Sequence, residues 1–561
     1  MNQTRVLLLF AWLFVAAMLW MNWNREMATP PAPAVVADVP GAPALDGAIP
    51  EARAPDALPA APGSAAAVPD AAPSDAAQAA PVTLANDVLR LSIDGRGGTV
   101  LAAELLDYAQ TTDEGSPPVR LLDTAPASYY VAQMGLVSSA GPAPNHESAF
   151  RLEPGSAREV DGRSEVAFVW EDGSGLRVRR VFALTPGSYV LDVHDEISNT
   201  GAAAWSGSVY RQLMRVPPVR RSGAFAFNDP ETFSFAGAAW YSPEDKYEKR
   251  KFGDFSDGPL NKTVTGGWIA MSQHHFISAW IPDPAVPTQF QLGQVGSVPY
   301  YVAREVGPAL ALAPGETATS SARLWIGPKL QGPMEAVAPG LRLSIDYGVF
   351  TFIAQPIYWL LSWFHSLVGN WGWAIVLLVL TIKLILYKLS ETQYKSFAKM
   401  RRLQPKMEAL KERYGEDKQK FQMAVMELYK KEKVNPAAGC LPILVQMPVF
   451  LALYWVLLEA PELRHAVWIP GWIDNLTARD PWFILPLLNA ATMYATQRLS
   501  PMATDPLQRK MMNAMPIIFG VMFAFFPAGL VLYWFTNGLL GLLQQWWLLR
   551  RHGDKPATAK G

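Results

Sequence analysis

The chain has 561 residues, which is long enough for two or more domains with linkers. Its formal net charge is −1, so the overall balance offers no general attraction to nucleic acid, but the charges are segregated along the chain. The single cysteine, Cys440, excludes an internal disulfide, and we interpret it as a packing residue. Half of the residues are hydrophobic, which favours a membrane protein if long apolar runs occur.

The first apolar run extends from Val6 to Trp23 and follows Arg5. It ends in bulky residues instead of a small-x-small cleavage site, so residues 1–27 are interpreted as an uncleaved signal-anchor span and not as a removed secretory signal. The positive-inside rule then places the following residues outside the cytoplasm. Residues 28–82 are predicted to be a flexible linker, because Ala and Pro occupy 33 of these 55 positions and no core can form.

Residues 83–330 change in character. Strand-like runs such as 88–93 and 177–182 are separated by turn signals such as Pro186-Gly187, and no long helical period appears. This pattern predicts an all-β sandwich, which lies outside the cytoplasm because it follows the first span. The adjacent pair His274-His275 falls in a strand-like run, so the two rings should point to opposite faces. A shared metal is therefore disfavoured, and we interpret the pair as surface or edge residues.

An amphipathic helix and five spans are predicted after the β domain. Residues 331–370 contain an aromatic-rich stretch with interspersed polar residues, which indicates a helix lying in the membrane interface. A core of five spans follows within 371–549, and several of these spans are short. The first would reach about 25 Å, less than the usual hydrocarbon thickness of about 30 Å. The predicted spans are 371–387, 441–458, 482–497, 512–526 and 528–549.

Basic residues determine the expected orientation. Segment 388–434 holds 13 Lys/Arg and 7 Asp/Glu, and the 498–511 loop and the 550–561 tail are also basic. The positive-inside rule assigns all three to the cytoplasm, which is satisfied by six spans with both termini inside. Apolar residues recur at helical spacing within 388–434, so a basic helical hairpin is predicted there, with a solvated charged loop as the alternative.

Lys383 is the residue that points most directly to a function. It lies at the end of an apolar run, and an ionisable group inside a span costs a few kcal/mol unless it faces water or a partner. Its position alone also permits snorkelling toward Lys388, about 7.5 Å away along the helix. No Asp or Glu occurs within the five spans, and polar residues recur in the neighbouring spans, which favours a wet cavity for an acidic or polar guest. These polar residues are Gln446, Asn489, Thr492, Gln497, Thr536, Asn537, Gln544 and Gln545.

Four sequence blocks resemble the YidC/Oxa family of membrane protein insertases: FAKMRRLQPK at 397–406, KVNPAAGCLP at 433–442, QMPVF at 446–450 and FPAGLVLYW at 526–534. The signal anchor and large β domain are similar to the Gram-negative form. The resemblance implies a polytopic α-helical membrane protein with six spans, a five-span insertase core and a large periplasmic β-supersandwich similar to carbohydrate-binding folds. It implies an insertase and chaperone of the inner membrane, acting alone or with the Sec translocon, and neither an enzyme nor a protein that uses a cofactor or metal.

The resemblance also implies a hydrophilic groove, open to the cytoplasm and lipid, in which a cation attracts the incoming chain. Lys383 occupies the cation position, where most bacterial relatives have Arg, so the charge is kept without the forked donor geometry. The implied partners are nascent membrane proteins, the Sec translocon, the ribosome, the signal-recognition pathway and the lipid bilayer, although the short tail argues against strong ribosome binding through it. The implied groove residues are Lys383, Gln446, Gln497, Tyr533 and Trp534, and those of the cytoplasmic hairpin are Lys399, Arg401, Arg402 and Lys406.

Two other classes of function remain open from the residues alone. A solute transporter could use Lys383 as its ligand site, but such proteins usually contain internal repeats, and none is apparent here. A periplasmic enzyme that binds or modifies glycans could instead be held at the membrane by the spans, in which case residues 83–330 would carry the function.

Overall fold

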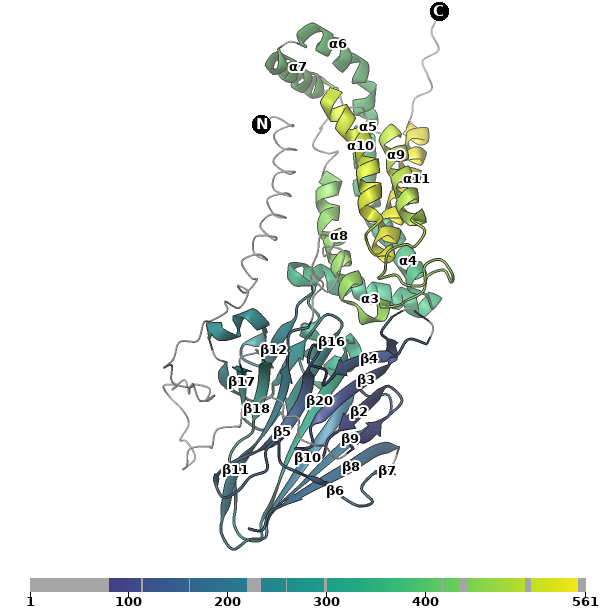
Figure 1. Cartoon of the computed structure of the whole chain (residues 1–561). Coiled ribbons are helices and arrows are strands. Elements are labelled where there is room, and N and C mark those ends of the chain that lie inside the picture. Colours follow the sequence, from purple (N-terminus) through teal and green to yellow (C-terminus); the bar gives the residue numbers. More distant parts are fainter. Residues whose placement is uncertain are drawn as a thin grey trace, which may run out of the picture.

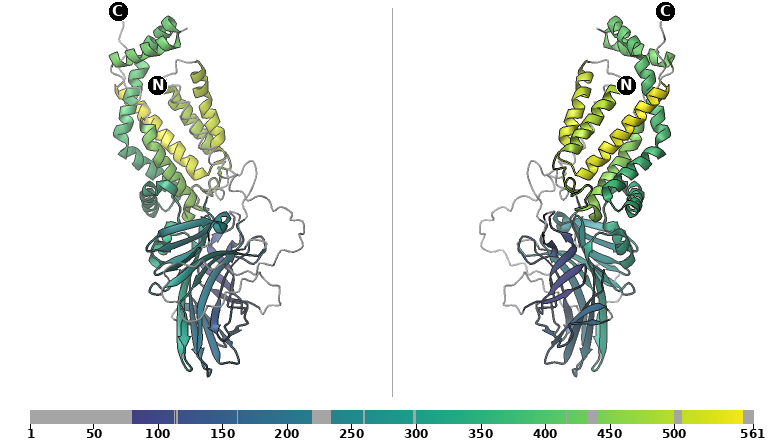
Figure 2. Two further views of the ribbon diagram at one scale, coloured as in Figure 1. Left: turned by 90° about the vertical axis from the view of Figure 1, so that its left-hand side faces the viewer. Right: turned by 90° about the vertical axis from the view of Figure 1, so that its right-hand side faces the viewer.

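The computed structural model describes residues 80–552 with the exception of 112, 114, 161, 219–233, 259, 297–299, 416, 433–440 and 500–505. The predicted signal anchor, nearly all of the linker, Cys440 and the end of the tail lie outside the described residues. The strands gather at one end of the molecule and the longer helices at the other (Figures 1 and 2). The hairpin of α6 (Gln404–Tyr414) and α7 (Lys418–Lys431) lies farthest from the strands.

Two antiparallel ten-stranded sheets form the β domain. In the first sheet, eight strands are hydrogen-bonded one after another, and β4 and β19 each pair with one strand of this series. The series is β1 (Val82–Ala85), β2 (Leu89–Ile93), β3 (Val100–Ala109), β5 (Tyr130–Ala140), β11 (Trp205–Arg215), β18 (Tyr300–Val306), β17 (Thr288–Val295) and β14 (Asn261–Val264), with β4 (Pro118–Leu122) on β3 and β19 (Leu310–Leu312) on β11.

The second sheet has nine strands in its main path, and β7 pairs with β8. The path is β13 (Lys246–Lys251), β12 (Gly237–Ser242), β15 (Trp268–Ser272), β16 (Phe276–Pro282), β20 (Thr317–Pro328), β10 (Val190–Asn199), β9 (Leu176–Leu184), β8 (Arg163–Glu171) and β6 (Arg151–Leu152), with β7 (Arg158–Val160) beside it.

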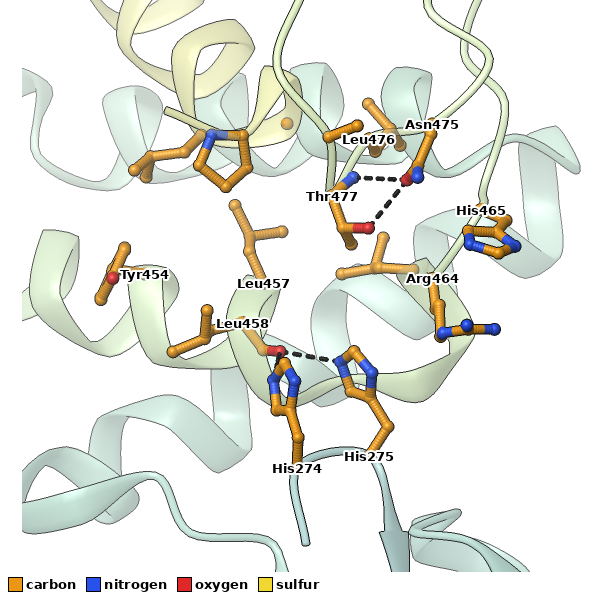
Figure 3. Close-up of a pocket in the computed structure, with 15 residues that line it drawn as sticks. His274, His275, Tyr454, Leu457, Leu458, Arg464, His465, Asn475, Leu476 and Thr477 are labelled. Atoms are coloured by element: carbon orange, nitrogen blue, oxygen red, sulfur yellow. Dashed lines mark hydrogen bonds between the residues drawn. The ribbon is translucent and has the colours of Figure 1, made fainter. Parts of the chain in front are cut away.

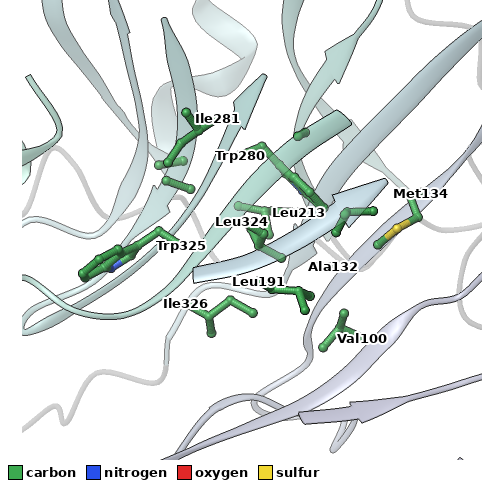
Figure 4. Close-up of a cluster of buried hydrophobic side chains, with 14 of the residues drawn as sticks. Val100, Ala132, Met134, Leu191, Leu213, Trp280, Ile281, Leu324, Trp325 and Ile326 are labelled. Carbon is green, nitrogen blue, oxygen red and sulfur yellow. The ribbon is translucent and has the colours of Figure 1, made fainter. Parts of the chain in front are cut away.

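The core of the β domain lies between the two sheets. Side chains from both, such as Leu213 on β11 and Leu324 on β20, are fully buried there (Figure 4). Side chains along β9 alternate between the core and the outer face of the sheet, and Arg180 is among those that point into the core. Its Nε lies 2.6 Å from Asp195 of β10, and Arg211 of β11 joins that carboxylate (3.0 Å) to Glu305 of β18 (2.9 Å). A buried ionic network therefore ties the sheets together, in which each charge has a partner, as burial requires.

Short helices connect the β domain to α3 (Thr351–Val368). Figure 1 shows α3 running across the molecule between the strands and the longer helices. One face of α3 is buried through Ala354, Ile357 and Leu361, while Phe352 and Trp359 on the other face are 73% and 68% exposed. This spacing is that of an amphipathic helix. The connecting helices are α2 (Gln331–Val337), η4 (Leu341–Ser344) and η5 (Gly348–Phe350), and η3 (Phe252–Asp257) lies within the β domain.

Five longer helices occupy the regions where spans are predicted. In the described part of the chain no single helix is both long and apolar enough to cross a bilayer by itself, whereas α4 and the first part of α5 qualify together, with a 68° bend between them. The helices expose many large apolar side chains, as surfaces facing lipid do. They are α4 (Trp371–Ile385), α8 (Leu441–Glu459), α9 (Ile484–Leu499), α10 (Pro506–Phe523) and α11 (Ala528–His552), with η7 (Pro461–Leu463) after α8.

The basic segment after α4 is helical, as one of the two interpretations predicts. It contains α5 (Tyr387–Arg402), α6 (Gln404–Tyr414) and α7 (Lys418–Lys431). Asp417 caps α7 by accepting hydrogen bonds from the backbone N–H groups of Gln419 and Lys420. Lys406 on α6 is 2.6 Å from Glu432, just beyond α7, so an ion pair joins the two arms of the hairpin.

Candidate functional site

Lys383 lies in the last turn of α4. This helix begins at Asn370, whose side-chain oxygen accepts a hydrogen bond from the N–H of Trp373 over 3.1 Å, and it continues through an apolar run without an acidic residue. A cation in the last helical turn is stabilised by the helix dipole. Within the part of the chain that the structure describes, no carboxylate lies within 4 Å of the Lys383 amine. The charge is therefore available to a group from outside the bundle.

Three helices meet at Lys383 because α11 carries a glycine there. A Cβ atom placed on Gly541 would lie 3.5 Å from Lys383 Nζ and 3.3 Å from the hydroxyl of Tyr394 on α5. The Tyr394 hydroxyl donates a hydrogen bond of 3.2 Å to the carbonyl of Gly541. Sequence reasoning did not identify Tyr394 or Gly541 as part of the site. Gly541 lies on a different helix from Lys383, so their contact can be recognised only when the packing of the helices is known.

A second polar contact joins α8 to α11. Gln446 Nε2 donates to Asn537 Oδ1 over 2.8 Å, so one predicted groove residue is bonded to another polar residue of the bundle. Phe450, one turn along α8, stacks on Tyr533 with centroids 6.0 Å apart and lies 4.8 Å from the ring of Trp534. The two predicted aromatic residues thus line the side of α11 that faces α8, and Tyr533 is almost fully buried.

Several polar groups on α11 and α9 occupy the interior of the bundle. Gln545 and Asn489 are each 1% exposed, and Thr492 lies close enough to Gly538 that a Cβ there would be 3.0 Å from its hydroxyl. Trp534 Nε1, Gln544 Nε2 and Gln545 Oε1 are buried without a hydrogen-bond partner among the described residues. Buried polar groups normally have partners, so these atoms are able to bind water or polar groups of a guest.

The remaining predicted residues lie apart from this cluster. Gln497 is near the end of α9, half-buried, and among the described residues it has no hydrogen bond to Lys383 or Gln446. Lys399, Arg402 and Lys406 lie on α5 and α6, and all three are exposed. The side chain of Arg401 is outside the described part of the structure.

The interpretation of His274 and His275 as surface or edge residues is wrong. They occupy the turn between β15 and β16, where adjacent side chains need not point to opposite faces, and their rings stack with centroids 3.7 Å apart. Nε2 of each ring lies within 3.0 Å of the carbonyl oxygen of Leu458 on α8. No metal-binding group of three or more suitable residues occurs in the described part of the chain.

Comparisons with known proteins assign the chain to a family. Residues 363–555 match the family described as 60Kd inner membrane protein, and residues 81–360 match the YidC periplasmic domain. Proteins named "Membrane protein insertase YidC" from Stenotrophomonas maltophilia and Xanthomonas campestris pv. campestris are each 51% identical to this chain, over 579 and 580 residues. These alignments cover 100% and 99% of this chain and 98% and 99% of the relatives.

A solved structure titled "Active YidC insertase crystal structure with the first transmembrane domain resolved" is 19% identical and covers 86% of this chain and 94% of its own. Its TM-score is 0.39. The family matches confirm the predicted fold class, a polytopic helical membrane protein with a large periplasmic β domain, and favour an insertase over the transporter and the anchored enzyme. The chain belongs to the YidC family of membrane protein insertases, which are inner-membrane proteins with a periplasmic domain and are not enzymes.

Proposed function

We propose that Lys383, Tyr394 and Gly541, together called the Lys383 cluster, receive the polar part of a substrate during insertion. The cluster would lie within a hydrophilic groove open to the cytoplasm and to lipid. The observation that carries this proposal is the convergence of Lys383 and Tyr394 on Gly541, inside spans without an acidic residue. A cation in a medium of low dielectric attracts an acidic or polar segment strongly. Gln446 and the buried polar atoms of α11 supply further hydrogen-bonding groups for that segment.

The apolar helix of the substrate then moves into lipid along α8 and α11. Support comes from large apolar side chains that both helices expose, Met447 on α8 and Leu543 on α11 being 41% and 52% exposed. An apolar guest helix would exchange contacts with these side chains for contacts with lipid at little cost, because both surroundings are apolar. Short spans such as α4, whose 15 residues reach about 22 Å, would thin the bilayer beside this path.

The proposed orientation places both termini and the basic hairpin in the cytoplasm. The positive-inside rule supports it, as does the position of α6 and α7 at the end of the molecule opposite the β domain (Figure 1). Residues 331–370, including α3, would lie in the periplasmic interface, with Trp359 and Trp363 at the headgroup level. The exposed cations Lys399, Arg402 and Lys406, together with Arg401, would contact incoming chains or anionic lipid headgroups.

Insertase activity implies nascent membrane proteins and lipid as partners. The Sec translocon, the ribosome and the signal-recognition pathway are proposed as further partners, because substrates must be delivered while they are being synthesised. The exposed cations Lys399, Arg402 and Lys406 make the hairpin the candidate for the ribosome contact.

Site-specific photocrosslinking tests the groove. A photoreactive residue at Gln446 or Trp534 should capture a stalled two-span nascent chain, whereas the same residue at Ile517, which is 69% exposed on α10, should capture lipid. Purified protein in vesicles should also insert the two-span substrate. Equal capture from all three positions, or insertion that does not depend on the protein, would reject the proposal.

A further inference from the structure

The outer end of α8 is enclosed by the β domain. The two histidines of the β15–β16 turn reach the carbonyl of Leu458, with Nε2 distances of 2.8 Å from His274 and 3.0 Å from His275 (Figure 3). The last carbonyls of a helix have no partner within the helix, so a donor from elsewhere must satisfy them. Here the donors come from a different domain, more than 180 residues away in the chain.

The histidine pair can make this contact only through its Nε2–H groups. Burial lowers the pKa of His274 to about 3 and that of His275 well below its usual value, and the nearby cations Lys329 and Arg464 act in the same direction. Both rings are therefore neutral near neutral pH, and each donates an Nε2–H hydrogen bond to the shared carbonyl oxygen. The rings also border a cavity of about 340 Å³ between this turn, the segment after α8 and the start of α11.

Two opposite charges are buried beside the histidines. Lys329, which follows β20, and Glu459, the last residue of α8, are each 1% exposed. Burial lowers the pKa of Lys329, and among the charges that oppose this effect Glu459 is the largest. Ser234 donates to Glu459 Oε1 over 2.8 Å, and the backbone N–H of Lys329 donates to the carbonyl of His275 over 2.9 Å. Lys329 Nζ and Glu459 Oε2 have no hydrogen-bond partner among the described residues, and no ion pair within 4 Å joins them there. The two buried charges therefore act on each other without direct contact, beside the histidines that bond α8.

Burial raises the pKa of Glu459 to about 7, and Lys329 is the strongest of the groups that oppose this rise by stabilising the carboxylate. A carboxylate at the C-terminal end of a helix is disfavoured by the helix dipole, and burying it adds a further cost. The cation that offsets this cost belongs to the β domain and not to the bundle. Buried charge pairs contribute little net stability, but they are costly to break, so they select one relative position of the two elements that carry them.

We infer that Lys329, Glu459 and the histidine pair are positioning residues for insertion: they hold the C-terminal end of α8 so that Gln446, in the first half of the same helix, keeps its bond to Asn537. Asn537 lies on α11, which also carries Gly541 beside Lys383. The inference rests on the proposed groove for its effect on insertion, but the position of α8 can be measured separately. Lys383 is 54 residues after Lys329 in the chain, and α3, which lies between them in sequence, packs against both α4 and α8.

The test is a cycle of Lys329→Met, Glu459→Gln and the double variant, in the full-length protein in lipid nanodiscs. Spin labels at Met447→Cys on α8 and Leu384→Cys on α4, in a Cys440→Ser background, report the distance between the helices; both label sites are exposed. Lys262→Met is the matched control, because Lys262 pairs with Asp245 at the domain surface and takes no part in the junction.

We expect a single narrow distance distribution for the parent and Lys262→Met, and a broadened or shifted one for each single junction variant, with an about tenfold loss of insertion. The double variant leaves no uncompensated charge, so its distribution should narrow again and its insertion should recover to within about threefold of the parent.

Unchanged distances between the spin labels in both single variants would overturn the inference. A double variant whose loss of insertion equals the combined losses of the two single variants would also overturn it. A changed distance with normal insertion would overturn the link to function. Failure of the groove proposal is distinguishable, because it would appear as normal insertion by Lys383→Glu while the junction variants still displace α8.

Discussion

At the scale of single residues, we predict that insertion depends on the charge of Lys383 more than on which basic residue carries it. The amine lies beside Gly541 and the Tyr394 hydroxyl, where no acidic residue of the spans neutralises it. Lys383→Arg keeps the charge and should retain insertion. Lys383→Glu should lower insertion about tenfold for substrates with acidic translocated tails, because attraction becomes repulsion. Pulse-labelling with protease protection of a two-span substrate in depleted cells would measure this, and equal insertion by the parent and Lys383→Glu would contradict it.

His274 should make the junction sensitive to acid. Its pKa is lowered from the usual 6.5 to about 3 by burial, so between these values the unfolded chain binds a proton that the folded protein does not. Stability contributed by the neutral ring is therefore complete above pH 6.5 and decreases as the pH falls toward 3, at a rate of at most about 1.4 kcal/mol per pH unit.

This prediction can be checked by thermal unfolding of the full-length protein between pH 7 and pH 4. The stability advantage of the parent over His274→Gln, which keeps a donor for Leu458 but cannot titrate, should shrink as the pH falls. His194→Gln is the matched substitution at an exposed residue outside the junction, where His194 bonds Ser321 on β20. A stability difference between the parent and His274→Gln that does not depend on pH would contradict the lowered pKa of His274.

At the scale of elements, the approach of α4, α5 and α11 depends on the absence of a side chain at Gly541. An added methyl group would meet the Tyr394 hydroxyl at 3.3 Å and the Lys383 amine at 3.5 Å, a tight contact that small shifts can relieve. Gly541→Ala should therefore retain most insertion. Gly541→Leu should separate the helices and reduce insertion about tenfold, because overpacking displaces neighbouring elements.

Membrane levels of both Gly541 variants, measured by immunoblotting, provide the control for folding. Comparable levels with a selective loss in Gly541→Leu would support the helix contact. Comparable insertion by the two variants would show that the three helices do not need to meet at this position.

At the scale of the whole molecule, damage to the junction between the β domain and α8 should reduce insertion more than removal of the whole β domain does. Removing residues 83–329 removes Lys329 and both histidines, and it also exposes Glu459 to water, where a carboxylate is stable without a partner. The Lys329→Met variant instead leaves Glu459 buried and uncompensated. Deletion with a flexible linker should therefore retain more insertion than Lys329→Met, measured at equal membrane levels. Complete loss on deletion would assign the insertion function to the β domain instead of the helical core.

The positions of the helices agree with the apolar runs; α9, for example, spans Ile484–Leu499 where a span was predicted at 482–497. Helical and strand periods are local properties of the chain, so they can be found without knowing what each element contacts. Positions within a run, such as that of Lys383 near the end of α4, follow for the same reason.

Contacts between elements distant in the chain were decided only by the tertiary structure. Lys383 and Gly541 are 158 residues apart, and His275 and Leu458 are 183 residues apart, so no local pattern predicts that they meet. The histidine pair was misassigned because the strand period was extended into a turn, where it does not apply. The sequence alone therefore determined which elements form and where the unusual cation lies. The packing of those elements determined which groups surround the cation and how the β domain holds α8, because contacts over long chain separations arise only from folding.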